Sequence, residues 1–120
     1  WVDMIVPGNG VRILVAARPV DFRKGIDGLA AVVQEVLALD PFAGDLFVFR
    51  PKRADRVKIL AWDGSGMTLY HKRLEEGRFR WPPPVDGVVK LSAAELSMLL
   101  EGLDWGRFWK RRPRTPQVAG

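Results

Sequence analysis

The 120-residue chain contains no cysteine and one histidine, His71. The lack of cysteine excludes disulfide bonds, thiolate nucleophiles and the common structural zinc sites. A single histidine that lacks an orienting partner and a nucleophile does not support classical hydrolytic chemistry. We therefore expect His71 to be a partly buried strand residue, and we expect no metal and no cofactor.

Long apolar runs and targeting signals are also missing. No uninterrupted apolar run approaches the ~18 to 20 residues of a membrane helix, and the N-terminus has no signal-peptide pattern. We predict a cytoplasmic protein with no membrane partner. Its 48% hydrophobic and 28% charged content is typical of a globular domain. We expect a flexible lead-in over residues 1–10, within which residues 1–3 look like a start-site extension, a single domain over residues 11–109 and a basic flexible tail over residues 110–120.

The chain has a modest excess of positive charge. It contains 19 Lys and Arg residues against 14 Asp and Glu residues, and the formal net charge of +5 favours a polyanionic partner such as nucleic acid. Most of these cations gather at residues 50–58, 72–80 and 110–114, and two more begin a predicted helix, where exposed amides also attract anions. The candidate nucleic-acid-binding residues are Arg23, Lys24, Arg50, Lys52, Arg53, Arg56, Lys58, Lys72, Arg78, Arg80, Lys110, Arg111, Arg112 and Arg114.

Hydrophobic periodicity predicts an α+β domain that begins with a strand and a long helix. Residues 11–16 are rich in β-forming side chains. Apolar residues then recur at helical spacing, which predicts an amphipathic helix over residues 22–38 with Asp21 as its N-cap. This helix should expose Gln34 and Glu35 and bury Ile26, Leu29, Val33, Val36 and Leu37.

The second half of the chain predicts an antiparallel meander of four or five strands and a short C-terminal helix. Short Gly-containing connections separate the β-rich segments. Ser92 and Glu95 form a capping-box pattern at the start of a helix that ends at residues 101–102. The strands are expected at residues 46–50, 57–62, 67–74, 78–81 and 88–91.

Loop lengths fix the expected pairing of these strands. The four-residue loop at residues 63–66 places Leu60 on the side of Met67 and Leu69, and Val57 and Ile59 on the side of Tyr70. A three-residue loop with Gly77 in the left-handed position would pair Leu74 with Arg78, and would place Phe79 and Trp81 on the Met67 side. The face that contains Tyr70 is partly apolar, so it needs a cover or a partner.

Several motifs, in one order, resemble a known family. They lie at residues 21–30, 46–50, 62–66, 72–79, 81–82 and 96–102. Together they are similar to the small accessory protein, called TnpB, that IS66-type bacterial insertion sequences encode. The resemblance spans residues 11–105. It implies a transposition accessory protein that acts beside a separate, larger DDE transposase. It does not imply the RNA-guided nuclease of the same name, for which the chain is too short.

Carboxylates are the ligands that the two metal ions of a nuclease would require. Asp21 fits a helix cap, Asp63 fits a turn, and Glu75 and Glu76 fit a hairpin tip, all ordinary structural uses. The first strand also lacks the acidic residue that a ribonuclease-H-like nuclease would place there. We therefore predict a non-catalytic protein. The carboxylates to which this reasoning applies are Asp21, Asp27, Asp63, Glu75, Glu76 and Asp86.

Two functional hypotheses remain open at this point. In the first, basic hairpins and the tail bind transposon ends or target DNA and so assist the transposase. In the second, the protein is an interaction subunit that binds the transposase or another element-encoded protein through its partly apolar face and through Trp105, Phe108 and Trp109. Salt-dependent DNA binding would favour the first, and co-purification with the transposase would favour the second.

Overall fold

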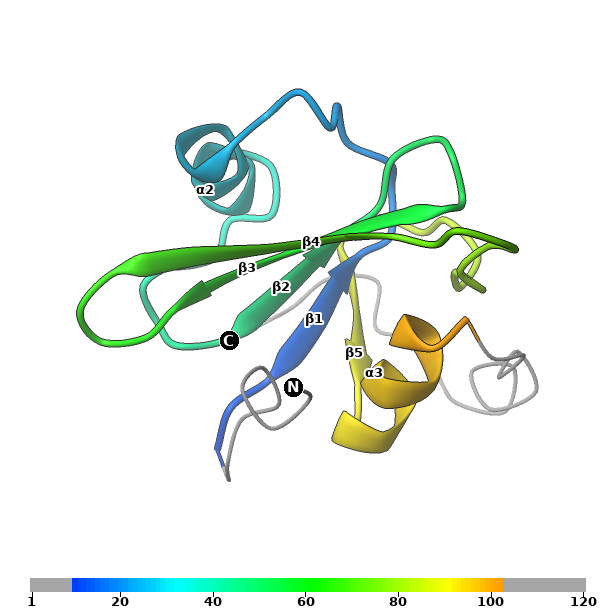
Figure 1. Cartoon of the computed structure of the whole chain (residues 1–120). Helices are drawn as coiled ribbons and strands as arrows, with labels where there is room; N and C mark the ends of the chain where they lie inside the picture. Colours follow the sequence, from blue (N-terminus) through cyan, green and yellow to red (C-terminus); the bar gives the residue numbers. More distant parts are fainter. Residues whose placement is uncertain (1–9, 103–120) are drawn as a thin grey trace.

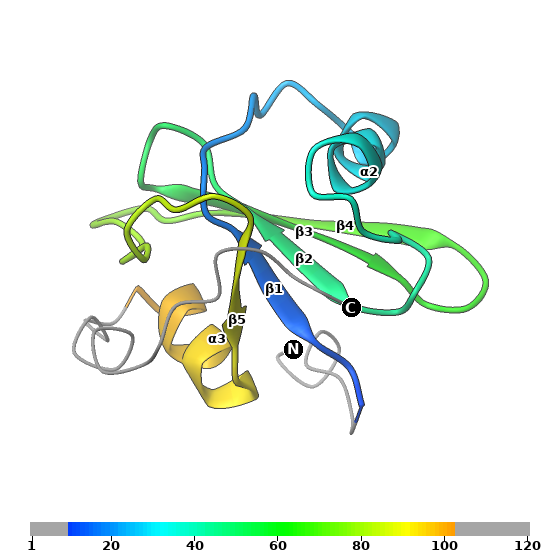
Figure 2. The same ribbon diagram turned by 180° about the vertical axis from the view of Figure 1, so that it is seen from behind.

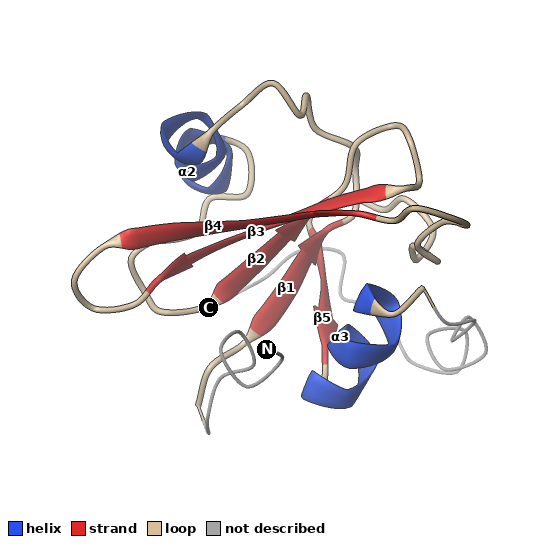
Figure 3. Ribbon diagram, viewed as in Figure 1, coloured by secondary structure: helices blue, strands red, loops and turns tan. Residues whose placement is uncertain are grey.

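Two helices and one five-stranded sheet make up residues 10–102, the part of the chain that this computed structural model describes. The helices pack on opposite faces of the sheet, as Figures 1 and 2 show from two sides. Figure 3 marks the same elements by type. The expected α+β class is confirmed. The elements are β1 (Ile13–Ala16), α2 (Ile26–Glu35), β2 (Leu46–Phe49), β3 (Arg56–Trp62), β4 (Met67–Arg73), β5 (Val88–Leu91) and α3 (Ala93–Leu100).

The sheet is mixed, with strand order β4-β3-β2-β1-β5. Strands β1 and β2 are parallel because α2 carries the chain back across the sheet between them. Strands β2, β3 and β4 form the expected antiparallel meander, and β5 returns antiparallel to β1. The sequence left the pairing of the first strand open, and the structure places β1 inside the sheet, parallel to β2.

Both faces of the sheet are covered, and each has its own hydrophobic core. Leu29 and Val33 of α2 pack on Phe47 and Leu60 on one face. The other face contains Val57, Ile59 and Tyr70, and α3 and Phe79 cover it. Strands β1 and β2 are consequently buried at every position instead of alternating. The expectation that the Tyr70 face needs a cover is confirmed.

Helix α2 is shorter than predicted and begins at Ile26, after the N-cap Gly25. Asp21 does not cap it, because the Asp21 carboxylate instead accepts the backbone N–H of Arg23 at 2.9 Å in a separate turn. The helix ends early because Ala38 adopts a left-handed conformation with φ of 56°. Exposure of Gln34 and Glu35 is confirmed, but Ile26 and Val36 are 39% and 73% exposed instead of buried.

Residues 78–81 form no strand, which corrects the second hairpin. The expected register of β3 and β4 is confirmed, with Leu60 opposite Leu69 and Ile59 opposite Tyr70. Gly77 has the expected positive φ of 79°. The chain then passes beneath the sheet, where the Phe79 N–H donates to the Ala54 carbonyl at 2.6 Å and the ring is buried. Phe79 and Trp81 therefore lie in the core on the Tyr70 side, opposite to the prediction.

Helix α3 follows the predicted boundaries. The Ser92 hydroxyl accepts the Glu95 N–H at 3.1 Å, and the Glu95 carboxylate accepts the Ser92 N–H at 2.8 Å, so both halves of the capping box form. Gly102, with φ of 72°, follows the helix. No helix within residues 10–102 is long and apolar enough to cross a membrane.

Candidate nucleic-acid interface

The loops that follow β1 and β2 meet at one end of the sheet. Because these two strands are parallel, residues 17–25 and residues 50–55 both begin at this end (Figure 1). A backbone hydrogen bond of 2.8 Å from the Val20 N–H to the Arg50 carbonyl joins the two loops. Two groups of cations that are far apart in the sequence therefore become neighbours.

The two loops enclose a groove of about 470 Å³. Four cations line it, together with Pro19, Val20, Phe22 and Pro51. Asp21 also lines the groove, and its carboxylate binds the Arg23 guanidinium at 2.7 Å. The groove therefore holds more positive than negative charge. We call it the basic groove and define it by Arg23, Lys52, Arg53 and Arg56.

Lys58 is an anchor for this groove and is not on its surface. The residue is only 7% exposed, and its ammonium donates to the carbonyls of Phe22 and Lys24 at 2.8 and 2.9 Å. It also lies 5.0 Å from the centroid of the Phe22 ring. These contacts tie residues 22–24, which precede α2, to strand β3.

A second hollow of about 340 Å³ adjoins the basic groove and shares Arg53 and Arg56 with it. Arg73 of β4 also lines this hollow and lies directly opposite Arg56 in the sheet. Asp55 is close to two of the guanidinium groups, with nitrogen–oxygen distances of 3.5 Å to Arg53 and 3.9 Å to Arg56. Sequence reasoning left Arg73 out of the candidate set, although the predicted β3–β4 register would have placed it beside Arg56.

The Arg50 side chain makes contacts within the protein that the sequence did not indicate. Its guanidinium lies 5.4 Å from the Trp81 ring centroid, and its Nη1 donates to the Pro82 carbonyl at 3.4 Å. Burial lowers the pKa of Arg50 below its usual value. The half-buried Trp81 therefore serves as a platform for Arg50 within the protein.

Known proteins that resemble this chain identify its family. A family model described as "IS66 Orf2 like protein" matches residues 11–110. The chain belongs to this family. An uncharacterized protein of Sinorhizobium fredii, y4jC, is 54% identical over 118 residues, which cover 97% of this chain and all of that protein. A second from the same organism, y4hO, is 45% identical over 102 residues, or 85% of this chain and 89% of that protein. No solved structure matches.

The remaining candidate cations of this IS66 Orf2-like protein are spread more widely. Lys72 donates to the Leu100 carbonyl at 2.8 Å, at the end of α3. The side chain of Lys24 lies against Gly28, at a position where a side chain on residue 28 would crowd it. Arg78 and Arg80 are exposed on the segment after β4, although not on a strand. Lys110, Arg111, Arg112, Arg114 and the aromatic residues Trp105, Phe108 and Trp109 lie outside the described residues.

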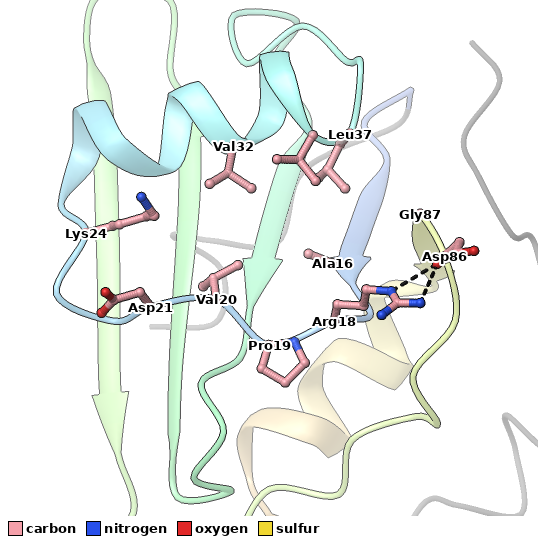
Figure 4. Close-up of a pocket in the computed structure, with 11 residues that line it drawn as sticks. Ala16, Arg18, Pro19, Val20, Asp21, Lys24, Val32, Leu37, Asp86 and Gly87 are labelled. Carbon is pink, nitrogen blue, oxygen red and sulfur yellow. Dashed lines mark hydrogen bonds and ion pairs between the residues drawn. The ribbon is translucent and has the colours of Figure 1, made fainter.

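An apolar hollow of about 530 Å³ (Figure 4) shares residues 19–21 of its lining with the basic groove. Val32 and Leu37 of the α2 region face Val20 across it. An exposed ion pair of 2.7 Å between Arg18 and Asp86 forms part of its rim. Sequence analysis of the IS66 Orf2-like chain missed this hollow because its walls come from three separate segments.

The pKa shifts of Asp21, Asp63 and His71 have structural causes. Hydrogen bonds from the Arg23 side chain and backbone lower the pKa of Asp21 from 3.8 to about 2. Backbone N–H groups of Ser65 and Gly66 lower the pKa of Asp63, which occupies the expected turn. Burial, followed by nearby cations, lowers the pKa of His71, which is more exposed than expected and has the Phe22 ring edge-on to it. Within residues 10–102, no three His, Asp or Glu side chains gather as metal ligands would.

Proposed function

We propose that this IS66 Orf2-like protein is a non-catalytic transposition accessory protein that binds the DNA backbone through its basic groove. Family membership supports the accessory role in transposition. The observation that carries the DNA-binding proposal is the convergence of Arg23, Lys52, Arg53 and Arg56, from two loops and the start of β3, onto one groove. Phosphate contacts of this kind supply most of the affinity in non-specific DNA binding.

The Arg56–Arg73 pair supports an anionic partner at the same place. Like charges that lie directly opposite each other in a sheet destabilise it. Asp55 and Glu75 line the same hollow and offset this repulsion in part, although the Asp55 carboxylate lies 3.9 Å from Arg56, beyond hydrogen-bonding distance. A phosphate group that bound both guanidinium groups would relieve the repulsion, since arginine matches phosphate geometry with paired hydrogen bonds.

The test is the salt dependence of binding to duplex DNA that carries the element's terminal repeat. Each phosphate contact adds about −0.9 to the slope of log affinity against log salt. The double variant Lys52→Ala/Arg53→Ala should therefore flatten the slope by about two. Arg18→Ala/Lys90→Ala removes the same charge outside the basic groove, so it should leave the slope nearly unchanged. Equal slopes for all three proteins would refute the proposed interface.

A second candidate function is transposase binding, which the apolar hollow favours. Val36 lines this hollow and is 73% exposed, so it offers an apolar side chain to a partner at the rim of the cavity. Val36→Glu should abolish capture of the transposase in a pull-down without disturbing the fold. Gln34→Glu adds the same charge to an exposed α2 position outside the hollow and should have no effect. The pull-down is repeated with terminal-repeat DNA, so that capture through DNA is recognised.

A further inference from the structure

Strand β4 lies at the margin of the sheet, with β3 on its inner side (Figure 1). We propose that a second copy of the chain pairs with its outer edge, antiparallel, about a twofold axis at Tyr70. The two five-stranded sheets would then continue into each other. This proposal concerns self-association and does not depend on DNA binding.

Within the described residues, the outer edge of β4 lacks the usual protection against strand pairing. Edge strands expose unpaired N–H and C=O groups, and proteins block them with proline, bulges or charged residues. The seven residues of β4 include no proline, and they pair one-to-one with β3 from Met67 to Arg73, without a bulge. Within residues 10–102, no strand pairs with the other side of β4.

The charged residues of β4 do not block the edge either. Both lie at the end of the strand, at Lys72 and Arg73. The Lys72 ammonium is held at 2.8 Å by the Leu100 carbonyl at the end of α3, so it is drawn toward one face of the sheet. Residues 67–71 carry no Lys, Arg, Asp or Glu, which leaves most of the strand open to pairing.

The sequence of β4 specifies the register of self-pairing. Two identical antiparallel strands related by a twofold axis require one residue to face its own copy, because paired residues must direct their hydrogen bonds toward each other. Tyr70 is the central residue of β4, so the axis at Tyr70 overlaps all seven residues. An axis at Leu69 or at His71 would leave five pairs of opposite residues instead of seven.

Charge favours the same arrangement. With the axis at Tyr70, Lys72 lies opposite Thr68 of the second copy, and Arg73 lies opposite its Met67. No two cations face each other. Parallel pairing in register would instead place both cations beside their own copies, which is destabilising. The seven-residue overlap supplies about six to eight main-chain hydrogen bonds, as in other cases of strand addition.

The cysteine-free chain makes this register testable by disulfide formation. Residues directly opposite in an antiparallel pair have Cα atoms about 4.5 to 5.5 Å apart, a separation that a disulfide bridges. Tyr70→Cys should therefore form covalent dimers on oxidation. Thr68→Cys should not, because its two copies would lie about 14 Å apart along the strands. The full-length chain before oxidation should sediment at twice its 13.5 kDa mass, at high salt as well as low.

Cross-linking between two different cysteine variants tests the same register without replacing Tyr70. Chains with Thr68→Cys should cross-link to chains with Lys72→Cys, and neither variant should cross-link to itself. A monomeric mass at about 100 µM, where a weak interface is occupied, would overturn the proposal. A dimer whose mixed cysteine variants do not cross-link, or in which Thr68→Cys cross-links to itself, would equally overturn it. Because DNA is absent throughout, these outcomes are separate from those of the salt-dependence test.

Discussion

Lys58 and Lys52 belong to the same basic stretch of sequence but have different surroundings. Lys58 is buried and donates to two backbone carbonyls, whereas Lys52 is exposed in the basic groove. Lys58→Met should lower the free energy of unfolding by about 1 to 2 kcal/mol, because it leaves the Phe22 and Lys24 carbonyls without their donor. Lys52→Met should change it by less than about 0.5 kcal/mol. Urea denaturation of both variants measures the difference, and equal losses would contradict the anchoring role.

Asp21 provides a pH-dependent prediction at the same scale. Its pKa is lowered to about 2, first by the Arg23 side chain and then by the Arg23 backbone N–H. The stabilisation from this exposed pair is fully present above the ordinary pKa of 3.8 and is lost as the pH falls toward 2. In an NMR titration, Arg23→Ala should raise the Asp21 midpoint but keep it below 3.8, because the backbone hydrogen bond remains. An unchanged midpoint would show that the side chain is not the cause.

At the scale of the element, the end of α2 is strained. Ala38 adopts a left-handed conformation that glycine adopts without cost. Ala38→Gly should therefore raise the free energy of unfolding by about 0.5 to 1 kcal/mol. The same substitution at Ala31, inside the helix, should lower it by about 1 kcal/mol. Thermal denaturation checks both signs, and destabilisation by Ala38→Gly would contradict the strain.

Elements defined by local chemistry were predictable from the sequence, and those defined by distant contacts were not. The Ser92–Glu95 capping box and the four-residue loop before Met67 act within a few residues, and both formed as predicted. The segment before α2 is held by Lys58, which lies more than thirty residues away and donates to two of its carbonyls. Residues 78–81 likewise follow the burial of Phe79 beneath the sheet instead of their β-forming pattern.

At the scale of the whole molecule, the order and direction of the strands create the candidate site. The sequence pointed to Arg23 and to the loop after β2 as separate clusters. Only the parallel pairing of β1 and β2 brings these clusters to one end of the sheet. The predicted meander left the place of the first strand open and so gave no reason for the two clusters to meet. Arg73 joins them through its pairing with Arg56 across the sheet.

The same topology predicts how protection from solvent varies across the sheet. Strand β1 has neighbours on both sides and is buried on both faces, and Leu14 pairs with Phe47 of β2. Their amides should exchange with deuterium only through global unfolding, and so most slowly. Alternate amides of β4, which point outward, should exchange fast in dilute protein. Hydrogen exchange followed by NMR measures both, and fast exchange at Leu14 would contradict the described core.

Residues 19–21 form a wall that the basic groove and the apolar hollow have in common. If a ligand enters the basic groove and shifts residues 19–21, it also changes the shape of the apolar hollow, and the reverse holds as well. The two occupancies then become linked equilibria, and the factor by which one ligand alters the affinity of the other is identical in both directions. Movement of residues 19–21 would thereby couple the binding of nucleic acid to the binding of a protein partner, although the two ligands would not touch each other.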